Sequence, residues 1–232
     1  TGVGKTQLTC GLLQALARLG YRAVGMKPVA SGCARTAQGP RSADALALMA
    51  AGNVAADYDE INPYGFAPAT APHLAARAAG VEISIERIQA QFERLRARAQ
   101  RVVVEGIGGW LTPIDAHATM ADVAARLGLP VILVVGVRLG CLNHALLTAR
   151  AVVEAGLELA GWVENHIEPD PAGALEGYSQ ALGQRIAAPR LGVAPYFSSP
   201  PPAAAWADGL DMETLRRVSS GNRDENQSKL QG

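Results

Sequence analysis

Residues 131–137 read Val-Ile-Leu-Val-Val-Gly-Val, an apolar run with Pro130 directly before it. A continuous β-branched run of this kind is typical of a strand that is buried on both faces of a parallel sheet. Further strands are predicted at residues 21–27, 102–104 and 159–163. Helices are predicted between them, at residues 7–19, 42–51, 83–100, 120–127, 143–155 and 174–186, with a loop at 62–72. This alternation implies right-handed crossovers, so we predict an α/β fold with a doubly wound, mostly parallel sheet.

The bulk properties exclude several classes of protein. The chain has 232 residues and a formal net charge of zero, so neither nucleic acid nor an acidic membrane surface is expected as a partner. No apolar run is long enough for a transmembrane helix, and no signal peptide is predicted. The three cysteines form no Cys-x-x-Cys pair, which fits a reduced, cytoplasmic setting. We expect one domain at residues 1–218 and a disordered tail at 219–232.

The chain starts with the second half of a phosphate-binding loop. Gly4, Lys5 and Thr6 stand directly before a segment rich in alanine and leucine. A loop of this type binds phosphate oxygens with its amides, reaches the β- and γ-phosphates with its lysine, and holds Mg²⁺ with its hydroxyl. The first glycine and its strand are missing, so we expect about ten residues upstream, a typical strand plus the loop start. The competing interpretation is a glycine-rich turn that only caps a helix.

Two carboxylates and a second lysine extend this hypothesis. Glu105 ends an apolar strand and precedes Gly106-Ile107-Gly108-Gly109, where the backbone can approach a ligand closely. Asp44 lies in the first turn of a predicted helix. An aspartate at this position can also serve only to interact favourably with the helix dipole. Lys27 ends the first strand and is followed by proline, which suits a point charge that faces phosphate. Mg²⁺ prefers such carboxylate ligands together with phosphates and water.

Several segments together resemble one family. In chain order they are Gly-Val-Gly-Lys-Thr, Lys-Pro-Val-Ala-Ser-Gly, Ser-Ala-Asp-Ala-Leu-Ala-Leu, Asn-Pro-Tyr with Ala-Pro-His, Val-Glu-Gly-Ile-Gly-Gly-Trp and Gly-Cys-Leu-Asn-His-Ala. This set resembles the dethiobiotin synthetases from the start of the chain to about Phe197. Lys-Pro-Val-Ala-Ser-Gly and Glu-Gly-x-Gly-Gly-Trp are specific to the resemblance, whereas the phosphate loop is shared with many ATPases. The implied fold is of the P-loop NTPase type.

The resemblance implies roles for individual positions. The catalytic residues are Lys27 and Lys5, and the Mg²⁺ ligands are Thr6, Asp44 and Glu105. The ATP-binding positions are Gly2, Val3, Gly4, Lys5, Thr6, Glu105, Gly106, Ile107, Gly108, Asn165, His166, Pro195, Tyr196 and Phe197. The substrate-binding positions are Thr1, Ser31, Thr112, Pro113, Gly140, Cys141, Leu142, Asn143 and Tyr178. Among these, the turn at 140–143 binds the substrate carboxylate at a helix N-terminus, and Tyr178 reaches it across a homodimer interface.

The implied reaction is the closure of a cyclic urea on 7,8-diaminononanoate with CO₂ and ATP, in the presence of Mg²⁺. Two features depart from the family: Gly2 stands where some members have glutamate, and Arg138 replaces a common lysine. The segment after Phe197 follows no pattern that we can assign. Alternative functions are a partition-type P-loop ATPase switch, the ATP-using domain of a cobyrinate amidotransferase, and a non-catalytic relative. The neutral charge disfavours the partition-type ATPase, and the chain is too short to include the glutaminase domain of a cobyrinate amidotransferase. A non-catalytic relative is disfavoured because Lys5, Thr6, Lys27 and Glu105 are all intact.

Overall fold

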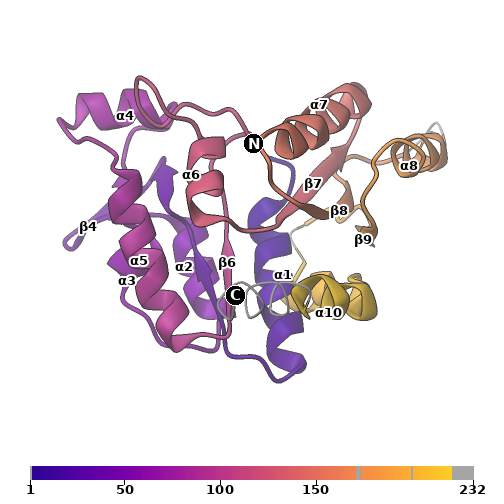
Figure 1. Ribbon diagram of the computed structural model, residues 1–232, viewed down its shortest axis with the longest axis horizontal. Coiled ribbons are helices and arrows are strands. Elements are labelled where there is room, and N and C mark those ends of the chain that lie inside the picture. The colour runs from indigo at the N-terminus through magenta and orange to yellow at the C-terminus, as the bar shows by residue number, and fades with distance from the viewer. Residues whose placement is uncertain (1, 171–172, 174, 200, 221–232) are drawn as a thin grey trace, which may run out of the picture.

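The computed structural model describes residues 2–170, 173, 175–199 and 201–220. Parallel strands run through its centre (Figure 1). Strand β1 (Ala23–Met26) pairs with β6 (Arg101–Val104), and β7 (Val131–Val137), β8 (Leu159–His166) and β9 (Arg190–Ala194) form a second parallel ladder in that order. The predicted parallel α/β architecture is therefore confirmed.

Helices cover both faces of these strands. The side chains of Val102 and Val104 pack into one apolar cluster and that of Val103 into another, as expected when successive residues of a strand point to opposite faces. Helices α5 and α6 belong to the first cluster, and α1, α9 and α10 to the second. The helices outside the segment between β1 and α5 are α1 (Lys5–Arg18), α5 (Ile85–Arg98), α6 (Met120–Leu127), α7 (Cys141–Glu154), α8 (Leu175–Gly183), α9 (Ala203–Asp208) and α10 (Met212–Ser220).

The segment between β1 and α5 contains more regular structure than we predicted. Its strands are β2 (Val29–Ser31), β3 (Ala34–Thr36), β4 (Gly39–Arg41) and β5 (Tyr64–Phe66), and its helices are α2 (Ala43–Ala51), α3 (Tyr58–Ile61) and α4 (Pro72–Ala78). The predicted loop at 62–72 was wrong in part, because β5 pairs in parallel with β2 inside it. Tyr64 and Phe66 are buried on either side of Gly65, and their packing overrides the turn-forming composition.

Other boundaries also differ from the prediction. Helix α7 begins at Cys141 rather than at 143, because Gly140 adopts φ +89° and turns the chain directly into the helix. Strand β8 continues three residues beyond the predicted end, to His166, because its last residues still pair with β7. Strand β9 and helix α9 were not predicted. Helix α10 includes the first two residues of the predicted tail, and residues 221–232 lie outside the described part of the chain.

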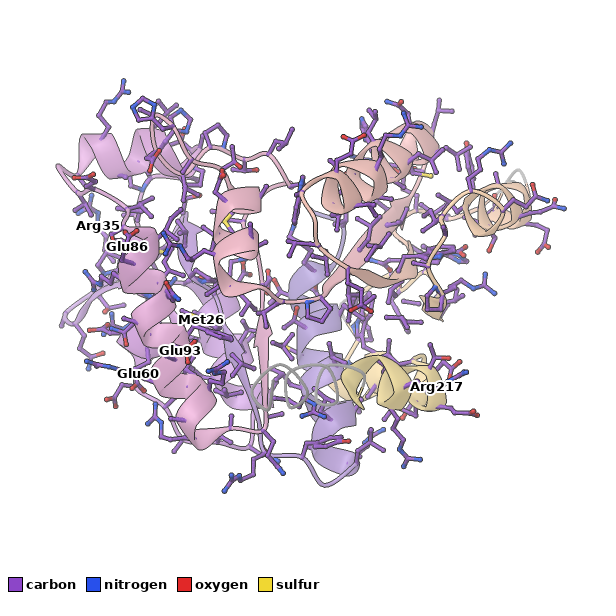
Figure 2. The ribbon with its side chains drawn as sticks, viewed as in Figure 1. Met26, Arg35, Glu60, Glu86, Glu93 and Arg217 are labelled. Atoms are coloured by element: carbon purple, nitrogen blue, oxygen red, sulfur yellow. The ribbon has the colours of Figure 1, made fainter. Side chains whose placement is uncertain are left out.

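The outer surface is rich in ion pairs, whereas most of the buried side chains are apolar. Met26 is fully buried behind α5, while Glu60, Glu86 and Glu93 lie along α3 and α5 (Figure 2). Each of these glutamates pairs with an arginine of α5 or α6. Exposed pairs of this kind contribute about 0–1 kcal/mol each, so the apolar clusters hold the fold together. Within the described residues, no helix combines the length and apolar character needed to cross a membrane.

Candidate functional site

The phosphate-loop segment leads directly into helix α1. Gly4 is the N-cap residue, with φ +85°, and its carbonyl accepts a hydrogen bond from the Leu8 amide at 3.0 Å. No side chain caps this end of the helix. The first amides of α1 therefore remain available, and together with the helix dipole they favour an anion. On the other side, Asn165 at the end of β8 donates a hydrogen bond from Nδ2 to the Val3 carbonyl at 2.9 Å.

Four charged residues and one hydroxyl gather beside this helix end. Lys27 Nζ donates to Glu105 Oε1 at 2.6 Å and lies 2.9 Å from Asp44 Oδ2. The Thr6 hydroxyl donates to the same Glu105 oxygen at 2.8 Å. Lys5, Lys27, Asp44 and Glu105, which we call the charged cluster, together carry two positive and two negative charges. The structure thus brings all the predicted lysines and metal ligands together.

The register of the central strands explains this convergence. Met26 pairs with Val104, so Lys27 and Glu105 are the residues that follow two paired positions at the carboxyl ends of β1 and β6. The Lys27 amide donates to the Ile61 carbonyl at 2.8 Å, and Asn62 Nδ2 donates to the Lys27 carbonyl at 2.6 Å. Both carboxyl ends of the strands therefore present their side chains to one point, as in other open α/β sheets.

The electrostatics of the charged cluster are set by burial and by mutual pairing. Burial lowers the pKa of Lys5 from its ordinary value of 10.5, and the neighbouring Lys27 lowers it further, against the opposing effect of Glu105 and Asp44. Burial alone would raise the pKa of Asp44, but the hydrogen bond and charge of Lys27, with help from Thr6, hold it below 3.8. Asp44 is therefore a carboxylate at neutral pH, as a metal ligand must be.

The same residues fit a magnesium ion. Glu105 Oε2 is buried and has no hydrogen-bond partner, which leaves a hard oxygen ligand free. The Thr6 hydroxyl is bonded to the other oxygen of Glu105, and the Asp44 side chain is 45% exposed toward solvent. In the described part of the chain, His, Cys, Asp and Glu side chains form no three-membered metal cluster. A metal site here would therefore combine two carboxylates and a hydroxyl with phosphates and water, the pattern that Mg²⁺ prefers.

The glycine turn after β6 lies against the charged cluster. The Gly106 carbonyl is 3.4 Å from Lys27 Nζ, and the Gly109 amide donates to Thr112 Oγ1 at 2.7 Å. Gly108 has φ +65°, and a Cβ atom there would stand 2.4 Å from the same Thr112 oxygen. Ile107 packs against the apolar cluster of α5 and α6. The turn is thus tightly folded on Thr112. It brings Thr112, a predicted substrate-binding residue, next to Gly108, which is predicted to bind ATP.

The other predicted substrate residues lie on separate elements. Ser31 ends β2, Pro113 forms a β-bridge with Thr119, and Tyr178 lies half-buried on α8. Residues 140–143 make the N-terminal turn of α7, in which Cys141 is buried and Asn143 exposed; Leu142, between them, is partly buried. None of these side chains hydrogen-bonds to the charged cluster within the part of the chain that the structure describes. Thr1 lies outside the described residues.

The remaining residues predicted to bind ATP lie at the carboxyl ends of the last two parallel strands. Asn165 and His166 end β8, and Pro195, Tyr196 and Phe197 come directly after β9. His166 Nε2 lies 2.8 Å from Glu164 Oε1, whereas Asn165 reaches the phosphate loop as described above. Since β8 and β9 are paired, these two segments emerge at the same sheet edge.

Sequence reasoning missed two residues at this site. Asn62 supports Lys27 through the backbone, and Trp206 on α9 packs beside the phosphate loop. Asn62 belongs to the Asn-Pro-Tyr segment of the family resemblance, but no role was predicted for it. Trp206 belongs to no recognisable motif, and no sequence signal identified α9. The three cysteines lie in the interior of the protein. All three are free and buried, and burial raises the pKa of Cys10 to about 11 and also raises that of Cys33.

Comparison with solved structures supports the fold. The MinD cell division protein of Aquifex aeolicus superposes with a TM-score of 0.53 at 14% identity, covering 95% of this chain and 93% of that one. MinD in its complex with MinC, from the same organism, gives a TM-score of 0.55 at 15% identity, covering 95% and 92%. At this identity the likeness concerns the fold alone, which is that of the P-loop NTPases.

Sequence comparison identifies the family. Residues 1–200 match the model of a family described as an AAA domain. A protein of Pseudomonas aeruginosa named ATP-dependent dethiobiotin synthetase BioD is 49% identical, covering 93% of this chain and 94% of its own length. Proteins of the same name from Pseudescherichia vulneris and Xanthomonas oryzae are 46% and 50% identical, covering 95% and 91% of this chain and 91% and 94% of their own. With this identity along nearly its whole length, the chain belongs to the dethiobiotin synthetase family.

Proposed function

We propose that this chain is an ATP-dependent cyclo-ligase that converts 7,8-diaminononanoate, CO₂ and ATP into dethiobiotin, ADP and phosphate. The observation that carries the proposal is the buried Lys27 ammonium, held between Asp44 and Glu105 beside the N-terminus of α1. Its environment suits the transfer of a phosphoryl group, in which catalysis consists mainly of positioning and charge stabilisation. Membership of the family supplies the identity of the substrate.

The reaction proceeds in three balanced steps. One substrate amine attacks CO₂ and loses a proton, which gives a carbamate. A carbamate oxygen then attacks the γ-phosphorus of ATP and ADP leaves, which gives a carbamic–phosphoric anhydride. The second amine attacks the carbonyl carbon of this anhydride, loses a proton and expels phosphate, which closes the cyclic urea. Lys5 and the α1 amides hold the phosphates during these steps, while Lys27 faces the charge that develops between carbamate and γ-phosphate.

The metal in this proposal is Mg²⁺, with Thr6, Asp44 and Glu105 as its protein ligands. When bound, Mg²⁺ would neutralise negative charge on the β- and γ-phosphate oxygens. The buried, unpartnered Glu105 Oε2 supports this assignment. The ammonium of Lys27 balances the two carboxylates in the charged cluster, and it lies beside the side chains that would hold the metal.

The substrate is held at its far end by its carboxylate. In the N-terminal turn of α7, residues 140–143, the Cys141 amide donates to the Arg138 carbonyl at 3.0 Å, so the turn offers this anion the amides of Leu142 and Asn143 and the helix dipole. Ser31 and the Thr112–Pro113 segment form the wall near the reacting amines, and Tyr178 contacts the carboxylate from the partner of a cytoplasmic homodimer. On the ATP side, Asn165, His166 and the turn at 195–197 enclose the adenine.

The test is to incubate the full-length protein with 7,8-diaminononanoate, ¹³C-bicarbonate, Mg²⁺ and ATP and to detect the cyclic urea by mass spectrometry. One ¹³C atom should enter the product for each ATP consumed, and omission of the diamine should abolish ADP formation. The proposal is wrong if no cyclic urea forms. ATP hydrolysis that instead responds to DNA or lipid vesicles would point to the partition-type ATPases.

A further inference from the structure

Helix α9 packs against helix α1, although no sequence pattern predicted it. Its Trp206 is only 5% exposed and lies in an apolar cluster with residues of α1 and β9. Two contacts fix the C-terminal end of the helix. Asp208 pairs with Arg18 at the last turn of α1 at 2.6 Å, and Leu210, just beyond α9, forms a β-bridge with Gly192 of β9. Trp206 is therefore held by a rigid element rather than by a loose loop.

The indole of Trp206 lies along two glycines of one helix face. Gly4 and Gly11 are seven residues apart, which places them on the same side of an α-helix about two turns from each other. A Cβ atom at Gly11 would stand 2.5 Å from Trp206 Cβ, and a Cβ atom at Gly4 would stand 3.2 Å from Trp206 Cη2. The side chain therefore spans the distance from the second turn of α1 to the phosphate loop, in a groove that only glycines leave open.

Trp206 and Asn165 meet at the same loop residue. The Cβ position of Gly4 is 2.4 Å from Asn165 Nδ2, and that amide group also holds the Val3 carbonyl at 2.9 Å. The loop backbone is thus clamped between an indole edge and an amide. Trp206 Nε1 is buried without a hydrogen-bond partner, although buried tryptophans usually find one. Trp206 therefore contributes at this place through its shape and not through its N–H group.

We propose that Trp206 is a positioning residue for the nucleotide, which holds the phosphate-loop backbone at Gly4 in the conformation that binds phosphate. This inference rests on the proposed function only in taking the loop as the ATP site. Trp206 takes no direct part in the proposed reaction. Its effect on nucleotide binding is transmitted through Gly4 and Asn165.

The test compares three variants of the full-length protein by calorimetric titration with MgADP, which needs neither the diamine nor turnover. Trp206→Leu should weaken MgADP binding by about ten-fold or more, which corresponds to a loss of about 1.4 kcal/mol. Trp206→Phe keeps an aromatic ring but loses the far edge of the indole that lies against Gly4. Its MgADP affinity should lie between that of Trp206→Leu and that of the wild type. Leu191→Ala is the matched control, because Leu191 is fully buried in the same cluster but packs on Gly161 of β8.

All variants are measured below their own melting temperatures, so that simple destabilisation does not change the affinity. The proposal requires Leu191→Ala to lower the melting temperature while its MgADP affinity stays at the wild-type value. It is overturned if Trp206→Leu and Trp206→Phe bind MgADP like the wild type, or if Leu191→Ala weakens binding as much as they do. Should Trp206→Leu not fold, Trp206→Phe alone decides the result. A wild-type protein that binds no MgADP would contradict the proposed function instead.

Discussion

Lys27 is the most constrained residue of the candidate site. Its ammonium is almost fully buried, and it lies within hydrogen-bond distance of two carboxylates that come from different elements. Breaking such a buried pair by removing one partner typically costs about 3–5 kcal/mol. Any test of Lys27 in catalysis must therefore separate lost transition-state stabilisation from lost folding, and the chain allows this separation.

We expect Lys27→Ala to reduce phosphoryl transfer by about 100- to 1000-fold, because one preorganised donor to the developing charge is lost. ATP binding should change far less, since Lys5 and the α1 amides hold the ground-state phosphates. Single-turnover kinetics beside an ATP titration measure the two effects. Lys27→Arg is the control: it keeps the buried ion pair and the fold, yet its planar fork should not restore the rate fully. A near wild-type rate in Lys27→Ala, or a loss only through ATP affinity, contradicts this role.

We also expect ATP affinity to fall at alkaline pH because of Lys5. Its pKa lies below the ordinary 10.5, mainly through burial, so its ammonium is lost at a lower pH than that of a free lysine. The protonated form binds phosphate, and the dissociation constant of ATP should therefore rise with pH already below 10.5. In Lys5→Arg, binding should be weaker but should not change over this range, since arginine stays protonated. Wild-type binding that is independent of pH up to 10.5 would contradict the prediction.

The residues of the site differ in how far the sequence predicts them. Lys5 and Thr6 stand in a motif whose spacing carries its chemistry, and Glu105 is found because it ends an apolar strand. The support of Lys27 by Asn62 is not predictable in this way, because it depends on where β5 returns to β2. Trp206 is a further example, since its neighbour Gly4 is about two hundred positions away in the chain and only tertiary packing brings them together.

At the scale of elements, the sequence predicts the long strands and helices with a strong hydrophobic period, and it misses the short ones. The central strand at 131–137 and the amphipathic α5 agree with their predictions within two residues, because their apolar patterns are long. Strands β2–β5 have three residues each, too few for a period. The apolar pattern of β9 is interrupted by Gly192. Helix α9 reads Ala-Ala-Ala-Trp-Ala-Asp, which contains only one large apolar residue.

Helix α8 is attached to the sheet by a buried polar network that was also not predicted. Glu164 on β8 is 1% exposed and accepts a hydrogen bond from Ser179 Oγ of α8 at 2.6 Å. Its carboxylate also lies 3.2 Å from Arg190 Nη1 and 2.8 Å from His166 Nε2. Ser179 directly follows Tyr178, so the network fixes the position of the tyrosine that we propose as a substrate contact.

From this network we expect Ser179→Ala to raise the KM for the diamine while the KM for ATP changes little. The variant loses a hydrogen bond to a charged group, which typically contributes about 1.5–3 kcal/mol to stability. Ser84→Ala is a suitable control, because it removes the N-cap of α5, typically costs about 1 kcal/mol, and lies far from α8 in the sequence. Steady-state kinetics and thermal unfolding of both variants test this. Equal diamine KM values in Ser179→Ala and the wild type would show that α8 needs no such attachment.

At the scale of the whole molecule, the distribution of apolar surface supports the proposed homodimer. Leu139 is 89% exposed just before α7, and Leu147 and Val153 on α7 are 58% and 60% exposed. Helices α7 and α8 lie side by side at one end of the molecule (Figure 1). The turn at 140–143 and Tyr178 thus belong to the same end as these side chains. A second copy packed against α7 would cover these side chains, and the proposed dimer places its Tyr178 near this turn.

A mixed dimer tests whether Tyr178 acts across the interface. If each site takes Lys27 from one protomer and Tyr178 from the other, a heterodimer of Lys27→Ala and Tyr178→Phe has one site with both defects and one site with none. Because the two sites of a symmetric dimer are equivalent, its activity should be about half that of the wild type, although both homodimers are impaired. The heterodimer can be isolated through two different affinity tags after co-expression, and its assembly checked by sedimentation velocity. If Tyr178 acts within its own protomer, both sites keep one defect and the heterodimer is no more active than the mean of the two homodimers. A stable monomer with full activity at working concentrations would remove the dimer itself from the proposed mechanism.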